Sequence, residues 1–231
     1  MGTERTGPDL TDVGNRQPSK DWNLMHLYQP RSVVAQSIMP SYKWMFEMKL
    51  NPSKDDVIVS MPAEFLSGSG KLVAKKEALQ LVAYIRSLKQ TPLPKGAVPP
   101  EFLYKRKPAN TEGSASGKSV DGEELYATNC AACHQANGEG LKGAFPSLKG
   151  SKVVTGENLE LYVDIIMNGY DANAEFGVMA AVGTNMEFTE FEVAAIINYE
   201  RNAWGNKGKE VTPEEVKKIM DFIKIKIAAN E

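Results

Sequence analysis

The sequence predicts a mainly α-helical protein in which a linker joins two parts. Three observations lead to this prediction. Several segments repeat their apolar residues at helical spacing, two of these segments start with a capping box, and residues 91–118 are rich in Pro, Gly and Ser, as linkers are. The chain therefore divides into an N-terminal part at 1–90, the linker at 91–118, a second part at 119–206 and an amphipathic helix within 207–231.

The N-terminal part is expected to be rich in loops and to end in one helix. Short apolar stretches such as "SVVAQSIM" and "DVIVSM" stand between polar segments. At 75–89 the pattern changes, because Leu79, Val82 and Ile85 recur at helical spacing. We therefore expect an amphipathic helix that closes this part.

The second part carries three helical patterns, at 122–130, 157–169 and 189–204. In the last of these, Glu192 follows Thr189 by three residues, so that each side chain can bond the backbone N–H of the other residue. This pairing predicts that the helix begins directly after Thr189.

The C-terminal segment repeats the same device. Thr212 is placed as the N-cap, Pro213 as the first helical residue and Glu215 as the partner in the box. One face of this helix is apolar: Val216, Ile219, Met220, Ile223 and Ile227. We expect that stripe to dock on this chain or on a partner, since the polar face lacks the basic excess typical of helices that lie on membranes.

The composition is that of a soluble protein: 42% of the residues are hydrophobic and the formal net charge is −2. This balance disfavours a wholly disordered chain and a nucleic-acid binder. Lys and Arg are in excess at 1–110, and Asp and Glu are in excess at 118–206. No run reaches the roughly 18 apolar residues of a membrane helix, and no basic-then-apolar signal begins the chain.

The pentapeptide "CAACH" at 130–134 contains both cysteines of the chain and one of its two histidines. Two thiols at this spacing, followed by histidine, are the pattern of c-type heme attachment. Cys130 and Cys133 would form thioethers with the two porphyrin vinyl groups, and His134 would bind the iron from the proximal side. The sequence therefore predicts one heme c.

Three other interpretations of the motif are weaker. A zinc site needs about four ligands, and the second histidine, His26, is more than a hundred residues away. A thioredoxin-like redox pair would be expected near a βαβ pattern, whereas the neighbouring patterns are helical. The third interpretation is that the two cysteines have no special role.

A methionine is expected on the distal side of the iron, because His/Met ligation suits an electron carrier. Three methionines follow the motif at suitable distances. Met167 falls within a helical pattern and Met186 just before the Thr189 cap, whereas Met179 falls in a loop that could wrap over the heme. We favour Met179, with Met186 as the next candidate.

Residues about 119–206 resemble a class I cytochrome c domain. The segments "GEELYATNCAACH", "GAFPSLKGS" and "VMAAVGTNMEFTEFEVAAIINYERNAWGN" carry the resemblance. It implies that the Pro146 carbonyl accepts a hydrogen bond from His134, and that Met179 is the distal ligand, although Ala180 stands where many members have proline. It also implies that Gly122 and Tyr126 meet Tyr199 where the first and last helices of the domain cross.

Residues about 5–90 resemble the monoheme cytochrome c subunit, subunit II, of cbb-type C-family heme–copper oxidases. The segments "RTGPDL", "HLYQPRSVV" and "IMPSYKWMFE" carry this match. In that family a membrane helix and a heme motif precede this region, and the methionine of the Met-Pro pair is the distal ligand. Met39 occupies that place here, but no CxxCH precedes it.

Two explanations of this incomplete pattern remain open. The chain is either a piece of a longer anchored diheme subunit, in which Met39 would bind a second heme, or it carries an incomplete cytochrome c-like domain that serves as an interaction module. The expected fold is thus one complete cytochrome c domain and one incomplete domain.

The resemblances together imply one-electron transfer through heme c, without any catalytic residue in this chain. The expected setting is the periplasmic side of the bacterial inner membrane, where the protein would relay electrons to the other subunits of a cbb-type oxidase. Its electron donor would be a soluble protein or one linked to quinol oxidation. The alternatives are a soluble electron shuttle, or a heme sensor or enzyme with an open sixth coordination position.

Overall fold

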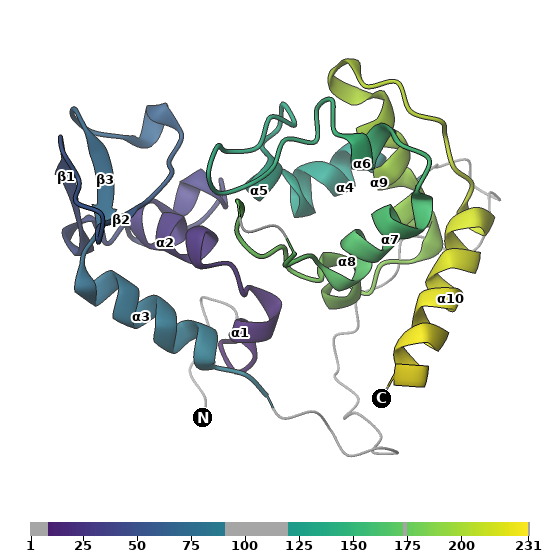
Figure 1. The fold of residues 1–231 in the computed structure, drawn as a ribbon, viewed down its shortest axis with the longest axis horizontal. Coiled ribbons are helices and arrows are strands. Elements are labelled where there is room, and N and C mark those ends of the chain that lie inside the picture. The colour runs from purple at the N-terminus through teal and green to yellow at the C-terminus, as the bar shows by residue number, and fades with distance from the viewer. Residues whose placement is uncertain (1–8, 91–119, 173–174, 231) are drawn as a thin grey trace.

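The computed structural model describes residues 9–90, 120–172 and 175–230. It is mainly helical, as expected, and consists of two bodies that lie side by side (Figure 1). Residues 9–90 form one body and residues 120–172 and 175–230 form the other, while the expected linker at 91–118 lies outside the described residues. Within the described ranges, no helix has the length and apolar character needed to cross a membrane.

The N-terminal body combines short helices with a three-stranded sheet. In chain order its elements are α1 (Val13–Arg16), α2 (Lys20–Tyr28), the 3-10 helices η1 (Pro30–Ser32) and η2 (Lys43–Met45), β1 (Phe46–Lys49), β2 (Val57–Ile58), η3 (Ala63–Phe65), β3 (Lys71–Ala74) and α3 (Lys76–Ser87). The strand order is β1-β3-β2, and β3 is antiparallel to both neighbours. The helix predicted at 75–89 is confirmed as α3. The sheet was not predicted, because strands of two to four residues are too short to show alternation.

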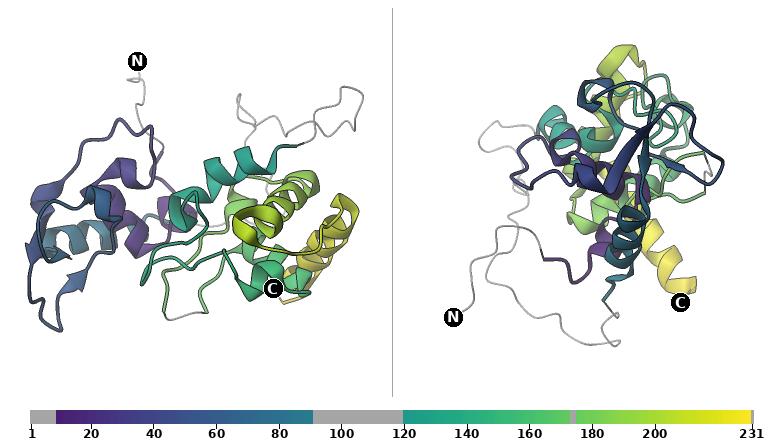
Figure 2. Two further views of the ribbon diagram at one scale, coloured as in Figure 1. Left: turned by 90° about the horizontal axis from the view of Figure 1, so that it is seen from above. Right: turned by 90° about the vertical axis from the view of Figure 1, so that its left-hand side faces the viewer.

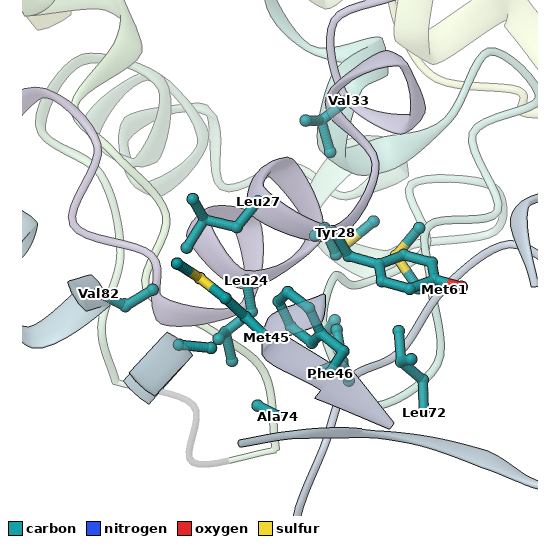
Figure 3. Packing of buried hydrophobic residues seen from close by; sticks show 14 of the residues in the cluster. Leu24, Leu27, Tyr28, Val33, Met45, Phe46, Met61, Leu72, Ala74 and Val82 are labelled. Atoms are coloured by element: carbon teal, nitrogen blue, oxygen red, sulfur yellow. The ribbon is translucent and has the colours of Figure 1, made fainter. Parts of the chain in front are cut away.

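The core of this body forms where α2 packs against the sheet and α3. Leu24 and Met25 of α2 are fully buried, and Val82 of α3 is nearly so. Figure 3 shows several of these side chains together with Tyr28 and Phe46, whose rings meet edge to face with centroids 5.4 Å apart. The core of this body therefore combines side chains of α2, α3 and the sheet.

The C-terminal body consists of helices. These are α4 (Gly122–Asn129), α5 (Ala131–His134), α6 (Lys152–Thr155), α7 (Leu159–Asn168), α8 (Val182–Asn185), α9 (Glu190–Asn202), the 3-10 helix η4 (Ala203–Gly205) and α10 (Pro213–Asn230). The predicted capping box at the start of α9 is confirmed: Glu192 N–H donates to Thr189 Oγ1, and Thr189 N–H donates to Glu192 Oε2. Reciprocal bonds also join Thr212 and Glu215 at the start of α10.

The C-terminal helix α10 docks on its own chain. Val216, Met220 and Ile223 are buried in the same cluster as residues of α7 and α9. Figure 2 shows α10 at the end of the molecule that lies farthest from the N-terminal body. Four of the five residues of the predicted stripe dock here, since Ile219 also packs against this cluster, whereas Ile227 is 45% exposed.

Helices α4 and α9 cross at very close range. A Cβ on Gly122 would lie 2.1 Å from the Ala195 carbonyl oxygen, so only glycine allows this approach. Beside the crossing, the rings of Tyr126 and Tyr199 pack with centroids 5.4 Å apart, and the Trp204 ring lies against both. The predicted meeting of Gly122 and Tyr126 with Tyr199 is confirmed.

The two bodies touch along the side of the C-terminal body that carries α5. Ala144 and Phe145 are buried in the core cluster of the N-terminal body, and Leu141 packs against it. Hydrogen bonds from Ser60 Oγ to the Lys142 carbonyl (3.2 Å) and from Asn185 Nδ2 to the Arg16 carbonyl (3.4 Å) also cross the boundary. The N-terminal body therefore covers one face of the domain that contains the CxxCH motif.

Candidate heme-attachment site

One tight helical turn presents both thiols and the imidazole. The Cys130 N–H closes α4 by donating to the Tyr126 carbonyl at 2.8 Å. The Cys130 carbonyl then accepts from the N–H groups of Cys133 (3.1 Å) and His134 (3.0 Å), which forms α5. Gln135 ends the turn with φ +63°. The local backbone therefore brings the three side chains of the motif together.

His134 is held in a defined orientation by the loop that follows. Its side chain is buried, and Nδ1 lies 3.0 Å from the Pro146 carbonyl oxygen. Because a carbonyl only accepts, Nδ1 carries the proton and donates, which leaves the lone pair of Nε2 available to a metal. Burial lowers the pKa of His134 more than the bond to Pro146 raises it, so the ring stays neutral.

The loop that carries Pro146 depends on a glycine. Gly140 has φ +63°, and a Cβ there would lie 2.4 Å from the Pro146 carbonyl oxygen and 2.5 Å from that of Phe145. Its N–H donates to the His134 carbonyl at 2.9 Å. Gly140 therefore lets the loop fold back so that Pro146 reaches the imidazole.

The two cysteines are free thiols that pack in different cores. Cys130 lies against the core of the C-terminal body, while Cys133 packs with Ala132 against the core of the N-terminal body. A group bonded to both sulfurs would therefore lie at the boundary between the bodies. No sequence pattern indicated this placement, because it depends on contacts between segments about a hundred residues apart.

Burial raises the pKa of the Cys133 thiol to about 12. Burial also raises the pKa of Cys130, and the nearby Glu200 and Cys133 add to this effect. Redox-active CxxC pairs have thiol pKa values below the usual range, so the thioredoxin-like interpretation is not supported. Within the described part of the chain, no group of three or more His, Cys, Asp or Glu residues is arranged to hold a metal ion.

Of the three candidate methionines, Met179 is held by the backbone between two helices. Its N–H and carbonyl exchange hydrogen bonds with Tyr170 (2.8 and 3.2 Å), and its side chain is partly buried. Met167 packs into the core of the C-terminal body, as its helical position suggested, and Met186 is 39% exposed after α8. Met179 as the distal ligand stays a prediction.

Met39 and His26 of the N-terminal body are far from the CxxCH turn in sequence, and their side chains pack against neighbours within that body. Met39 is partly buried against the local core. His26 lies on α2 with its ring centroid 4.5 Å from that of Trp22, and burial lowers its pKa. A role for Met39 in binding a second heme stays a prediction.

Sequence reasoning missed one buried group near the motif. Glu200 of α9 is only 4% exposed, and it accepts a hydrogen bond from the Tyr162 hydroxyl of α7. The signal was present, since Glu200 follows Ile196 and Ile197 by four and three residues and so falls on the apolar face of the helix.

The residues of this site fit heme c. Two thiols that can form thioether bonds to the porphyrin, an oriented neutral imidazole and a methionine in a loop between two helices are the groups that a His/Met-ligated heme c uses. In addition, Gln135 directly follows His134 in the sequence. Its Nε2 group is buried and has no hydrogen-bond partner in the described structure. A polar edge of a bound cofactor would satisfy such a donor.

Replacing Gly140 should disturb the loop more than replacing a matched glycine. Gly150 also has a positive φ, of +72°, but a Cβ there would meet nothing within 4 Å. We expect Gly150→Ala to cost about 1 kcal/mol of unfolding free energy from backbone strain, and Gly140→Ala to cost about 1–3 kcal/mol more from the clash with Pro146. Denaturant unfolding of the two variants measures this difference, and equal losses would contradict the assigned role of Gly140.

Comparison with known proteins gives two family matches. Residues 1–65 match the family described as "Cytochrome C oxidase, mono-heme subunit/FixO", and residues 119–204 match "Cytochrome c". One cytochrome c-552 of Thermus thermophilus is 36% identical over 118 residues, covering 46% of this chain and 79% of that protein. A second cytochrome c-552 from Thermus thermophilus is 37% identical over 111 residues, covering 43% of this chain and 84% of that protein.

A relative with a different name also matches. The protein "Alcohol dehydrogenase (quinone), cytochrome c subunit" of Gluconacetobacter polyoxogenes is 31% identical over 145 residues, which cover 61% of this chain. The match spans 30% of the length of that relative. With the turn at Cys130–His134, the Pro146 contact and the α4–α9 crossing, these matches show that the chain belongs to the cytochrome c family, with a cytochrome c domain at 119–204 and a region of the mono-heme oxidase subunit type at 1–65.

Proposed function

We propose that this c-type cytochrome relays single electrons to a cbb-type heme–copper oxidase through one heme c held at the CxxCH turn. The observation that carries the proposal is the geometry of α5, where two thiols and an oriented neutral imidazole share one turn. The matched oxidase-subunit region at 1–65 supports the choice of partner.

Each residue of the site has a distinct task. Cys130 and Cys133 would hold the porphyrin by thioether bonds, His134 would bind through Nε2, and Met179 would complete the coordination. When bound, the heme supplies a centre that accepts and donates one electron. The Pro146 carbonyl keeps the imidazole proton on Nδ1, and the apolar residues around Cys133 and Phe145 exclude water from this side.

The packing of the two bodies supports electron transfer from a heme at the CxxCH turn to an oxidase that binds the N-terminal body. Cys133 packs against the core of the N-terminal body, so this body would lie between the attachment site and a partner that docks on its outer surface. The proposed setting is the periplasmic side of the inner membrane, with a soluble or quinol-linked electron donor. In this arrangement the chain makes and breaks no substrate bond.

Replacement of Met179 tests the coordination. In the heme-loaded protein, Met179→Leu should abolish the weak far-red absorption band of the Met-bound ferric form and lower the reduction potential, because thioether ligation favours the reduced state. Met186→Leu, at the other loop methionine, should leave both unchanged. A far-red band that survives in Met179→Leu but disappears in Met186→Leu would assign the ligand to Met186 instead.

Docking on the oxidase tests the proposed partner. The affinity-tagged, heme-loaded full chain should bind a purified cbb-type oxidase and be oxidised by it in the presence of oxygen. Trp44, 62% exposed, lies within a segment that carries the oxidase-subunit resemblance, whereas Phe222, 52% exposed, lies on α10. If the N-terminal body makes the contact, Trp44→Ala should weaken binding by about tenfold or more, as loss of an interface aromatic does.

In the same assay Phe222→Ala serves as the matched control and should bind as the unaltered protein does. A chain that is red and redox-active, yet neither binds nor is oxidised by the oxidase, would be a soluble shuttle. A stronger effect of Phe222→Ala than of Trp44→Ala would move the contact from the N-terminal body to the C-terminal body and contradict the proposed docking face.

A further inference from the structure

Glu200 is a buried carboxyl group without a cationic partner in the described parts of the chain. It lies on α9 and is 4% exposed, and no ion pair found among the described residues includes it. The Tyr162 hydroxyl of α7 donates a hydrogen bond to Glu200 Oε2. Burying a carboxylate is costly unless it is paired or takes up a proton, so this group is poised to change its protonation state.

The neighbouring cation does not neutralise Glu200, because it is engaged elsewhere. The Arg201 guanidinium donates to the carbonyls of Val154 (2.8 Å), Gly156 (2.8 Å) and Lys209. It also lies 5.9 Å from the centre of the Tyr162 ring. Arg201 thus ties α9 to the backbone around α6 and to the segment before α10.

The other titratable groups around Glu200 are mostly neutral. On α4 and its C-terminal cap these are Tyr126 and Cys130, on α7 Tyr162, and on α9 Tyr199. Glu200 raises the pKa of each of these four groups. The charged residues Lys152 of α6 and Lys217 of α10 are exposed to solvent. Within the described residues, no second buried group that titrates at neutral pH is therefore available near Glu200 to compensate a change of charge.

Glu200 lies close to the attachment site, because Cys130 packs against the cluster that contains Tyr162, whose hydroxyl donates to Glu200. The Cys130 pKa is raised first by burial and next by Glu200. An electron that arrives at a group bonded to Cys130 adds a negative charge in the same protein interior, where charges interact more strongly than in water. A carboxylate nearby is then destabilised relative to the carboxylic acid.

We propose that Glu200 binds one proton from water when the site at Cys130–His134 gains one electron, and releases that proton when the electron leaves. The electron comes from the donor protein or an electrode, and the proton adds to a Glu200 carboxylate oxygen, so that the net charge of the interior does not change. No other bond forms or breaks. This inference rests on the proposed function and extends it, because it couples electron transfer to proton binding.

The proton affinity of Glu200 suits this coupling near neutral pH. Burial raises the pKa of Glu200 to about 7, against the opposing effect of the Tyr162 hydrogen bond. Linkage is reciprocal: if reduction tightens proton binding, proton binding must raise the reduction potential. The potential should therefore fall as pH rises between the pKa of the oxidised form and that of the reduced form. The slope is at most about 59 mV per pH unit, and the potential should level off on either side.

The test measures the midpoint potential of the heme-loaded full chain against pH. Glu200→Gln removes the titrating group but keeps its shape and its acceptor for the Tyr162 hydroxyl. Glu192→Gln is the matched control, since Glu192 is also a buried carboxyl group on α9, eight residues earlier. We expect a sloped region around pH 7 in the unaltered protein and in Glu192→Gln, and a potential that is flat across this region in Glu200→Gln.

A third variant moves the slope instead of removing it. Tyr162→Phe deletes the donor that lowers the Glu200 pKa, so the sloped region should shift to higher pH. An unaltered protein with a flat potential, or a Glu200→Gln variant with the unaltered slope, would overturn the inference.

Infrared difference spectra provide an independent readout. The reduced-minus-oxidised spectrum near pH 7 should contain the C=O stretch of a protonated carboxylic acid, present in Glu192→Gln and absent from Glu200→Gln. If Glu200→Gln does not fold, this band in the unaltered protein and the shift in Tyr162→Phe decide the question, and the absence of either contradicts the inference. A colourless chain would defeat the proposed function as well, whereas a red protein without the slope defeats the coupling alone.

Discussion

The hydrogen bond between His134 Nδ1 and the Pro146 carbonyl is the constraint on which the site depends. It joins the turn that carries both thiols to the loop that follows, and it decides which imidazole nitrogen can bind a metal. Two other contacts stabilise the loop that makes this hydrogen bond. The close approach of Gly140 lets the loop fold back, and Trp204 fixes the start of the loop by donating from Nε1 to the Ala136 carbonyl at 3.0 Å.

The position of the motif between two cores gives the N-terminal body a role in the site. Cys130 belongs to the packing of the C-terminal body and Cys133 to that of the N-terminal body. The region of the oxidase-subunit type is therefore more than an appended module, because it forms the apolar wall on one side of the motif. Glu200 lies in the other body, where its partner Tyr162 belongs to the cluster that Cys130 packs against, so the two bodies provide different surroundings for the two cysteines of the motif.

Features that depend on local patterns could be predicted from the sequence. The caps at Thr189 and Thr212, the helix at 75–89 and the CxxCH turn all follow from residues a few positions apart. The contact between Pro146 and His134, twelve residues apart, was available only through the family resemblance. The small sheet and the packing of Cys133 on the N-terminal core depend on pairings that no local pattern reveals. Glu200 was overlooked because a glutamate within a helix is usually solvated.

The central claim is that one heme is bonded to both cysteines of the turn. The most direct test is the intact mass of the denatured full chain after expression in a host that matures c-type cytochromes. The account predicts a single species that is heavier than the polypeptide by one heme, with no titratable thiol and with the added mass retained by a peptide that contains Cys130 and Cys133. A polypeptide of unmodified mass, with both thiols free, would contradict it.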